Sequence, residues 1–248
     1  MIFRIVLLAA LAPVAAMLYF IYTKDKLRKE PVPEILKAFG FGVLSALASL
    51  LLTYPLMFLG IVPAEEPATV WESIRLAVFG AGIPEELAKF CLLWLFLKKC
   101  RYFDEYVDGI VYAACVGLGF AALENVLYLF RNFDSWVLVG AMRALYSIPG
   151  HFFFAVVMGY FVSKAFFDDP SQRSRNIFLA LAVPMLLHSA FDALLMVSSV
   201  SAAAAAFGAL FIGLFIFMAT TSKKLINKHL EADKRIMDNQ ENQENLQA

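Results

Sequence analysis

The sequence has few charged residues and no net charge. Only 17% of its 248 residues are charged, and 21 basic side chains balance 21 acidic ones. A neutral chain has no basic field to attract a nucleic acid, so we expect no nucleic-acid partner. The short alternating strands of a membrane β-barrel are also missing. These absences argue against nucleic-acid binding proteins and against barrels.

Cysteine, histidine and the common hydrolase motifs are scarce or absent. The three cysteines, Cys91, Cys100 and Cys115, fit neither a zinc motif nor a redox motif, and we interpret them as packing residues. The chain has no G-x-S-x-G nucleophile elbow and no H-E-x-x-H zinc motif. It has only three histidines. The sequence therefore does not carry the usual signatures of a serine hydrolase or a zinc protease.

Long hydrophobic runs dominate the chain. Hydrophobic residues make up 61% of it, and the mean hydropathy is +0.70. About 20 apolar residues are enough to cross a bilayer as a helix. This composition predicts an all-α, polytopic transmembrane helical bundle of about seven spans in a lipid bilayer. The expected spans are 2–22, 35–60, 74–97, 107–130, 137–165, 176–197 and 202–221.

The loops between these spans alternate in charge. The first loop carries Lys24, Lys26, Arg28 and Lys29, whereas the second loop, 62–73, has no lysine or arginine. Because positively charged loops remain in the cytoplasm, we expect the N-terminus outside and the C-terminus in the cytoplasm. We accordingly interpret the first span as a retained membrane helix and not as a cleaved signal peptide.

The domain organisation follows from the same pattern. We expect residues 1–221 to form one transmembrane domain with its core at about 74–197. Residues 222–248 contain one weakly amphipathic stretch and end in Asn, Gln and Glu, which predicts a partly disordered cytoplasmic tail. His229 in this tail is expected to be solvated.

Glycine and proline interrupt two of the expected spans, near 80–84 and 147–150. Such breaks free backbone groups that lipid cannot satisfy, so they lie inside the protein or beside water. Glu85 and Glu86 follow the first break, and His151 follows the second. A packing kink explains either break alone, but a titratable group after both indicates a functional site.

Ionisable residues inside the spans reinforce this interpretation. Each costs about 2.5–3.5 kcal/mol at the centre of a spanning helix, so such residues mark functional sites. Lys89 lies four residues after Glu85 and three after Glu86, which allows it to pair with either. Three further spans carry polar groups at intervals of four, on one helix face. These are Glu124 and Tyr128, then Arg143, Ser147 and His151, then His188 and Asp192.

The depths of these groups are similar. At about 1.5 Å per residue, all of them lie within ~20 Å of the outer surface. Small residues at Ala113, Gly117 and Ala121 are expected to let the third span approach the fourth and bring Glu85 near Glu124. Two simpler interpretations stay open: Glu124 only bonds a neighbouring helix, or Arg143 only extends to the membrane surface.

The residue types suit hydrolysis. A buried glutamate is a plausible general base for water, and histidines with a second carboxylate complete a hydrolytic site. Two imidazoles and a carboxylate, for example His151, His188 and Glu124, also suit zinc with one position open for water. The residues alone leave metal-free and metal-dependent hydrolysis both open. Our candidate catalytic set is Glu85, Glu86, Glu124, His151, His188 and Asp192, supported by Lys89, Tyr128 and Arg143.

Four motifs in this order resemble one known family across about residues 30–200. Residues 85–89 resemble the E-E-x-x-K motif of the PrsW family of intramembrane proteases. Residues 120–128 resemble its F-x-x-x-E-x-x-x-Y motif, His151 matches its isolated histidine, and 188–192 match its H-x-x-x-D motif. The sequence Asp108-Gly-Ile-Val-Tyr112 also resembles that of the family. The family is distantly similar to the type II CAAX prenyl endopeptidases and the glutamic intramembrane proteases.

This resemblance implies an endopeptidase in which Glu85 activates water. Glu124 and Asp192 stand where the distant relatives have a histidine and an asparagine, and a carboxylate donates to an oxyanion only when protonated. His151, His188 or a metal would then take that role. The implied substrate is a single-span, anti-sigma-factor-like membrane protein, cut on its outer side in a bacterial plasma membrane at the start of a stress response.

Two other functions remain open on the sequence. An ion-coupled transporter also uses intramembrane carboxylates and broken helices, although we find no matching half-repeats. A non-catalytic binding protein on a protease-like scaffold would keep the motifs without the activity. Loss of cleavage when Glu85 is changed separates the protease from both.

Overall fold

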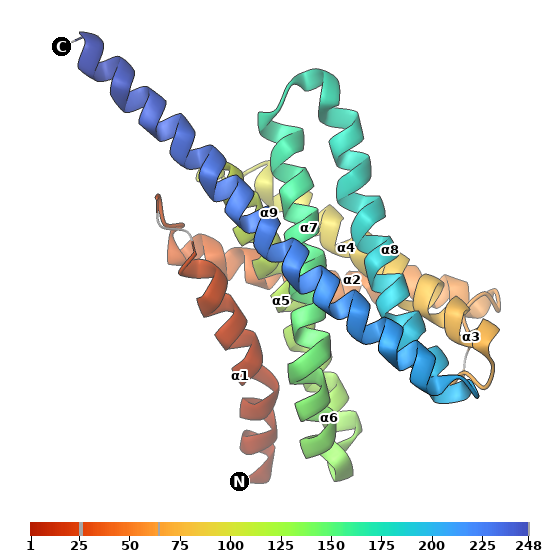
Figure 1. Ribbon diagram of the computed structural model, residues 1–248. Coiled ribbons are helices and arrows are strands. Elements are labelled where there is room, and N and C mark those ends of the chain that lie inside the picture. Colours follow the sequence, from red (N-terminus) through yellow and green to blue (C-terminus); the bar gives the residue numbers. More distant parts are fainter. Residues whose placement is uncertain (25–26, 64, 248) are drawn as a thin grey trace.

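The computed structural model describes residues 1–24, 27–63 and 65–247, so Lys26 of the first loop lies outside the described residues. The described part is helical throughout and contains no strand. Figure 1 shows the arrangement of the helices. In chain order the elements are α1 (Ile2–Tyr22), α2 (Val32–Phe58), α3 (Val70–Arg75), η1 (Leu76–Gly82), α4 (Ile83–Leu97), α5 (Tyr106–Arg131), η2 (Phe133–Ser135), α6 (Trp136–Met142), η3 (Arg143–Ser147), α7 (Ile148–Phe167), η4 (Pro170–Gln172), α8 (Arg173–Val200) and α9 (Ala204–Gln247).

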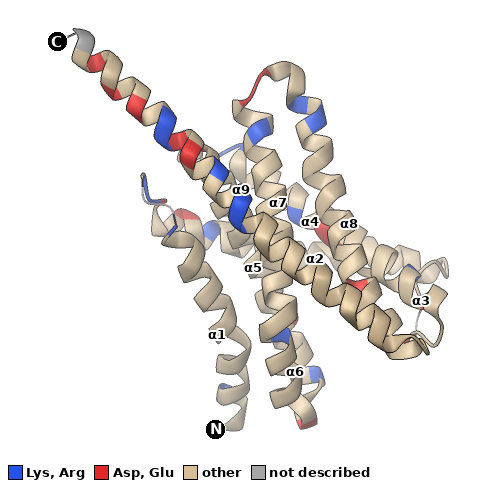
Figure 2. Ribbon diagram, in the orientation of Figure 1, with Lys and Arg blue, Asp and Glu red and all other residues tan. Residues whose placement is uncertain are grey.

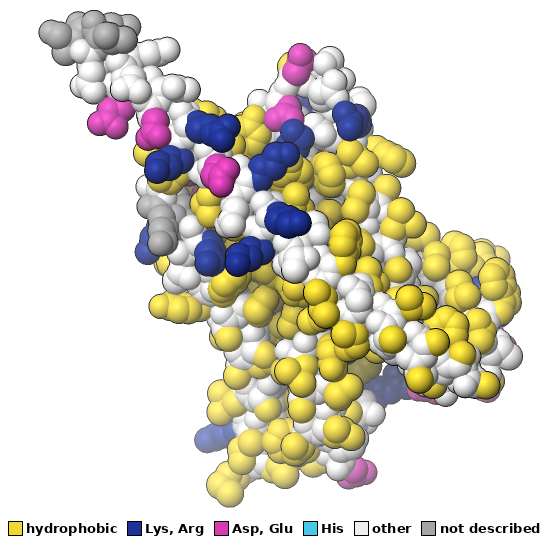
Figure 3. Space-filling model, in the orientation of Figure 1, with side chains coloured by type: hydrophobic (Ala, Val, Ile, Leu, Met, Phe, Trp, Pro, Cys, Tyr) yellow, Lys and Arg dark blue, Asp and Glu magenta, His cyan; other side chains and the backbone are white. Residues whose placement is uncertain are grey.

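Six helical segments of the described chain are long and apolar enough to cross a membrane. They correspond to every predicted span except the third, 74–97, which forms the continuous helical stretch η1–α4 and carries the charged residues of the E-E-x-x-K motif. Large hydrophobic side chains lie exposed on the outside of the bundle, for example Phe58 at 91% and Leu51 at 76%. Figure 3 shows this apolar covering on one face. The predicted all-α polytopic fold is confirmed.

Helix α5 is the centre of the bundle and is buried along most of its length. Helices α1, α2, α4 and α7 pack around it. The α2–α5 crossing depends on glycine, because a Cβ added to Gly119 would lie 2.1 Å from the carbonyl oxygen of Phe39. Because α5 is held this closely, the position of each of its side chains along the bundle is fixed.

The small-residue ridge on α5 packs against α7 and not against the third span. A Cβ added to Gly117 would lie 2.7 Å from the Cβ of Ala155, and one added to Gly159 would lie 2.8 Å from the Cβ of Ala113. The expectation that this ridge admits the third span is therefore wrong at these positions. Helix α4 instead packs mainly against α2 and α8.

The two predicted helix breaks are π-helical turns. Segment η1 directly precedes α4, whose first turn contains Pro84, and η3 directly precedes α7, whose first turn contains Pro149. A wide π turn accommodates a proline, which has no N–H to donate, and such turns are frequent at functional sites. Gly82 at the end of η1 allows contact with α8, because a Cβ there would lie 2.1 Å from Ser189 Oγ.

Helix α9 crosses the outside of the bundle obliquely and continues through 222–247 (Figure 1). Its charged residues gather towards the C-terminal end (Figure 2). Ser222, Ile226 and His229 nevertheless point inwards and are at most 4% exposed. The ring of His229 stacks on Tyr160 at a centroid distance of 4.3 Å. The expectation that His229 is solvated is wrong, and residues 222–229 of the tail that we expected to be partly disordered lie in a packed helix.

Candidate active site

The first turn of α4 places two carboxylates around one ammonium group. Lys89 Nζ donates to Glu86 Oε1 at 2.8 Å and to Glu85 Oε2 at 3.3 Å. The side chains of Glu86 and Lys89 are only 1% and 3% exposed, whereas that of Glu85 is 14% exposed. The dipole of the helix favours negative charge at this end. The structure thus distinguishes an enclosed glutamate, Glu86, from a more open one, Glu85.

His188 on α8 reaches the same carboxylates. Its Nδ1 lies 2.9 Å from Glu86 Oε1, and its Nε2 lies 3.4 Å from Asp192 Oδ2 and 3.9 Å from Glu85 Oε2. The ring stacks on Phe154 with the centroids 4.6 Å apart. An imidazole that faces carboxylates with both nitrogens donates to both only as an imidazolium. This geometry favours the charged form of His188.

His151, at the start of α7, links Lys89 to Glu124. Lys89 Nζ lies 3.1 Å from His151 Nδ1, and His151 Nε2 lies 2.8 Å from Glu124 Oε2. An ammonium group can only donate, so Nδ1 must accept and the ring proton sits on Nε2, where it bonds the carboxylate. The contacts thereby assign a neutral His151 with a defined tautomer.

Arg143 and Asn125 extend the network to α1. Arg143 Nη2 donates to Glu124 Oε2 at 2.7 Å, and its Nε donates to Asn125 Oδ1 at 2.8 Å. Asn125 Nδ2 donates to the carbonyl oxygen of Ala10 at 2.7 Å. The Arg143 guanidinium also lies 4.1 Å above the Tyr128 ring. Arg143 therefore turns inwards, with a side chain 12% exposed, and does not extend to the membrane surface.

Two residues of this site were missed at the level of sequence, and a third was seen only as part of a motif. Asn125 is the link to α1, Phe154 supports His188, and the ring of Phe120, the first residue of the F-x-x-x-E-x-x-x-Y motif, lies 3.8 Å from Lys89 Nζ. The two missed residues have weak signals: Asn125 is a polar residue in an apolar span, and Phe154 lies one helical turn from His151. That signal is not specific, because apolar spans contain many aromatic residues.

Two cavities open onto the network. One of about 200 Å³ is lined by Glu124, His151, His188 and Asp192 among others. A second of about 310 Å³ lies between α2, α4 and α5 and is lined by Glu85 and Glu124. Of the six candidate catalytic residues, only Glu86 lines neither of these cavities. The structure therefore brings all six together, and it encloses Glu86 away from both cavities.

The donor set suits a divalent metal, with a different carboxylate from the one expected. Glu85, His151 and His188 each offer a ligand atom within 4.8 Å of the others, whereas Glu124 is held by Arg143 and His151. His151 has a carboxylate on one nitrogen, as metal-bound histidines usually do, whereas His188 has Glu86 on Nδ1 and Asp192 3.4 Å from Nε2. The residues thus fit a metal in type and in their supporting contacts. Before a metal could bind, Lys89 would have to release His151 Nδ1 and His188 would have to lose its Nε2 proton.

A buried acid–base cluster between the helices of a multi-span membrane protein is the arrangement that a membrane-embedded hydrolase needs. The model of the PrsW family of intramembrane metalloproteases matches residues 30–221. The chain therefore belongs to this family and is an intramembrane protease that acts on a protein substrate.

Individual relatives agree with this assignment. A protein named Protease PrsW from Clostridioides difficile (strain 630) is 35% identical over 192 residues, 77% of this chain and 79% of the relative. The Bacillus subtilis (strain 168) protein of that name is 36% identical over 187 residues, 75% of this chain and 81% of the relative. The one from Geobacillus kaustophilus (strain HTA426) is 37% identical over 188 residues, 76% and 78% of the two chains. No solved structure matches the chain.

Proposed function

We propose that this protease cleaves a single-span membrane protein on its outer side, with Glu85 as the general base. The observation that carries the proposal is the convergence of Glu85, His151 and His188, whose ligand atoms lie within 4.8 Å of one another. A base must lie within reach of the proton that it removes, in a site that water can enter. Glu85 meets both conditions, because it is the more open glutamate and lines a cavity.

Peptide hydrolysis in this geometry begins with Glu85 taking a proton from water. The water oxygen then bonds to the peptide carbonyl carbon, and the carbonyl electrons move to its oxygen. The Nε2–H group of the His188 imidazolium, whose contacts with Asp192 and Glu85 are long at 3.4 Å and 3.9 Å, turns to this oxyanion and stabilises it. When the C–N bond breaks, Glu85 returns the proton to the leaving nitrogen. The water thus supplies the hydroxyl group of the new carboxyl end and the proton of the new amino end.

The other residues position this pair. Glu86 holds His188 Nδ1 and Lys89 at 2.9 Å and 2.8 Å, and Asp192 lies 3.4 Å from the second nitrogen of His188. Glu124 fixes His151 and is itself fixed by Arg143. Both departures from the distantly similar proteases, Glu124 and Asp192, are thus explained as carboxylates that orient histidines, a role for which no proton is needed.

A divalent metal, when bound, supplies a Lewis acid that polarises the peptide carbonyl. Glu85, His151 and His188 would hold it, and Glu85 would then be a metal ligand instead of the general base of the metal-free site. Their supporting carboxylates, Glu86 and Glu124, already occupy the outer nitrogens of the two imidazoles. Lys89 is the cation of the metal-free site, since it lies within 3.3 Å of Glu85 and 3.1 Å of His151.

The proposed location is the outer half of a bacterial plasma membrane, with the N-terminus outside and the C-terminus in the cytoplasm. Support comes from the alternating loop charges and from the depth of the polar residues below the side whose loops have few lysines and arginines. Together with the resemblance to PrsW proteins, this points to an anti-sigma-factor-like substrate whose outer part is cut at the start of a stress response.

The test uses the purified protein in proteoliposomes with a single-span reporter substrate. We expect one new cleavage site near the outer end of the reporter's span, located by mass spectrometry. A parallel sample with a chelator distinguishes metal-dependent hydrolysis, which stops and recovers with zinc, from metal-free hydrolysis, which continues. An intact reporter combined with an ion flux that depends on Glu85 would contradict the proposal and favour a transporter.

A further inference from the structure

A groove separate from the active site lies where α1, α7 and α9 meet. It has a volume of about 400 Å³. Its walls are apolar and include Phe20, Phe152, Phe153 and Ile226. Phe20 is 41% exposed, so one wall is open to the surroundings of the bundle. A groove of this kind fits a hydrocarbon chain.

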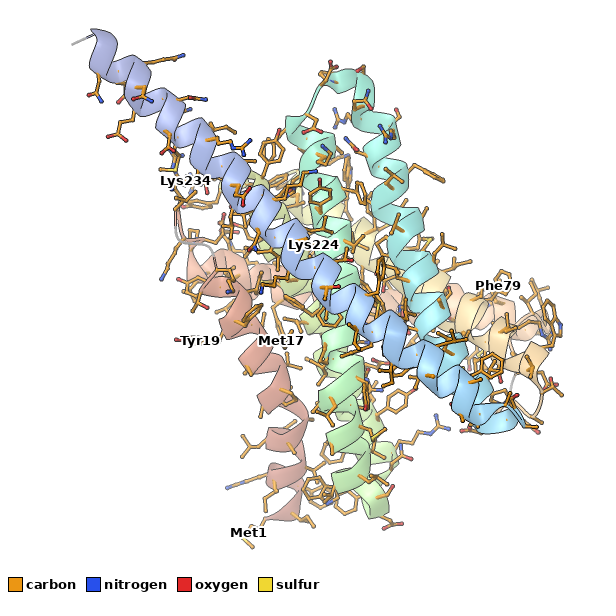
Figure 4. The ribbon with its side chains drawn as sticks, in the orientation of Figure 1. Met1, Met17, Tyr19, Phe79, Lys224 and Lys234 are labelled. Atoms are coloured by element: carbon orange, nitrogen blue, oxygen red, sulfur yellow. The ribbon has the colours of Figure 1, made fainter. Side chains whose placement is uncertain are left out.

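One end of the groove carries positive charge. Lys24, two residues after α1, and Lys223 on α9 line it, and both are exposed. Neither lysine forms an ion pair with a carboxylate among the residues that the structure describes. Lys224 and Lys234 lie further along α9 (Figure 4), and Figure 3 shows basic side chains gathered here above an apolar surface. The groove therefore joins a cationic rim to an apolar interior.

Ser222 provides a second, independent observation. It lines the same groove, is 2% exposed, and its Oγ has no hydrogen-bond partner within the described chain. A buried hydroxyl without a partner is unfavourable. Ser45 and Ser49, two other buried helix serines, bond a carbonyl of the preceding turn, at 2.7 Å and 2.9 Å. The free hydroxyl of Ser222 indicates a polar partner that comes from outside the chain.

We propose that this groove binds one anionic phospholipid. The phosphate group lies between Lys24 and Lys223, an acyl chain follows the wall formed by Phe152, Phe153 and Ile226, and Ser222 donates to an oxygen of the lipid. A basic pocket between membrane helices is the arrangement that recognises anionic headgroups. The bound lipid connects α1 to α9, two helices on the outside of the bundle that contact the catalytic helix α7.

The test is native mass spectrometry of the full-length protein in detergent, titrated with phosphatidylglycerol or phosphatidylcholine. We expect the first phosphatidylglycerol to bind more tightly than phosphatidylcholine. The double variant Lys24→Gln/Lys223→Gln should bind it roughly 30-fold more weakly, because each lysine near a headgroup contributes about a factor of five. The matched control, Lys98→Gln/Lys99→Gln, removes the same charge from an exposed loop and should bind normally.

A second variant, Ala219→Phe, fills the groove without changing charge and should also weaken the first binding event. Inorganic phosphate has the charge of the headgroup but no acyl chains. It should not compete with the lipid when both are present at the same concentration. Equal binding of the two lipids, equal binding by the lysine variant and its control, or full competition by phosphate would each overturn the proposal. These readouts do not involve proteolysis, so they stand apart from the proposed function.

Discussion

Lys89 is the side chain that holds the two halves of the site together. It contacts Glu85 and Glu86 on its own helix, His151 on α7, and the face of Phe120 on α5. Buried charges persist in a protein only when they are paired, because an unpaired one carries a large desolvation cost. The pairing of Lys89 with Glu86 is the most enclosed in the site, with both side chains at most 3% exposed.

This pairing predicts strong coupling between the two residues. Lys89→Met and Glu86→Gln should each lower the free energy of unfolding by about 3–5 kcal/mol, because each leaves a buried partner uncompensated. The double variant should lose much less than the sum of the two. Thermal and denaturant unfolding in detergent micelles measures the three variants against Lys98→Met, an exposed control. Strictly additive losses would show that the pair is not coupled.

The residues of the site could be predicted from the sequence, but most of their partners could not. Glu85, Lys89 and His188 stand out because charges are costly in an apolar span. The bond from Arg143 to Asn125, and from Asn125 to Ala10, joins residues on different helices. Spacing along one helix shows which residues share a face, but it does not show which face of another helix lies opposite.

Close helix crossings set where the side chains of the candidate site lie along the bundle. Gly42 on α2 faces α5 so closely that an added Cβ would lie 2.1 Å from the carbonyl oxygen of Val116, whereas nothing lies within 4 Å of a Cβ added at Gly40. Carbonyl oxygens on a buried helix cannot move aside as a flexible side chain can. Gly42 and Gly119 together therefore define how near α2 comes to the helix that carries Glu124.

We expect Gly42→Ala to destabilise the protein by about 1–3 kcal/mol, the usual cost of forcing extra volume into a packed contact. Gly40→Ala on the same helix should be neutral or stabilising by up to about 1 kcal/mol, because alanine favours the helix. Unfolding midpoints in detergent compare the two. Equal midpoints would mean that α2 and α5 are not packed at this crossing.

A side chain of α9, Asp233, caps the N-terminal end of α5. The carboxylate of Asp233 accepts hydrogen bonds from the backbone N–H groups of Tyr106 and Val107, both at 2.8 Å. Free N–H groups at the start of a helix are satisfied in this way by acidic side chains. The sequence did not reveal this contact, since the partner of the cap lies more than a hundred residues away and the hydrophobic pattern of the tail is weak.

Asp233→Ala should lower the free energy of unfolding by about 0.5–2 kcal/mol, as loss of a helix cap does. Asp238→Ala, an exposed position on the same helix, should have no effect. Hydrogen exchange at the amides of Tyr106 and Val107 gives a local readout, and it should become faster only in the first variant. Unchanged exchange would show that α9 does not cap α5.

The whole molecule combines irregular segments with a bundle of regular spans. The two helix breaks were predictable because glycine and proline are visible in a sequence, and the structure forms them as the π turns η1 and η3. The third predicted span, 74–97, is not among the six long apolar segments. Glu85, Glu86 and Lys89 lie in the middle of it, so it is less apolar than the others. The two irregular segments, η1 and η3, are thus the ones that lead into the candidate site.

The proposed orientation makes a separate prediction for the molecule in its membrane. A fluorescent protein fused to the C-terminus should fluoresce, and alkaline phosphatase fused there should be inactive, because both outcomes require a cytoplasmic location. The same reporters inserted after Glu66 should give the opposite results, since the 62–73 loop is expected outside. Identical results at both positions would exclude this topology.

The account rests on Glu85 being the base of a hydrolytic site built from several helices. Its sharpest test is the cleavage rate of one single-span reporter by purified wild-type protein, Glu85→Gln and the exposed loop control Glu66→Gln, each checked for the same unfolding midpoint. The account predicts that Glu85→Gln loses a factor of about 10²–10⁴, the usual contribution of a general base, and that Glu66→Gln keeps the wild-type rate. A Glu85→Gln protein that folds normally and cleaves as fast as the control would contradict it.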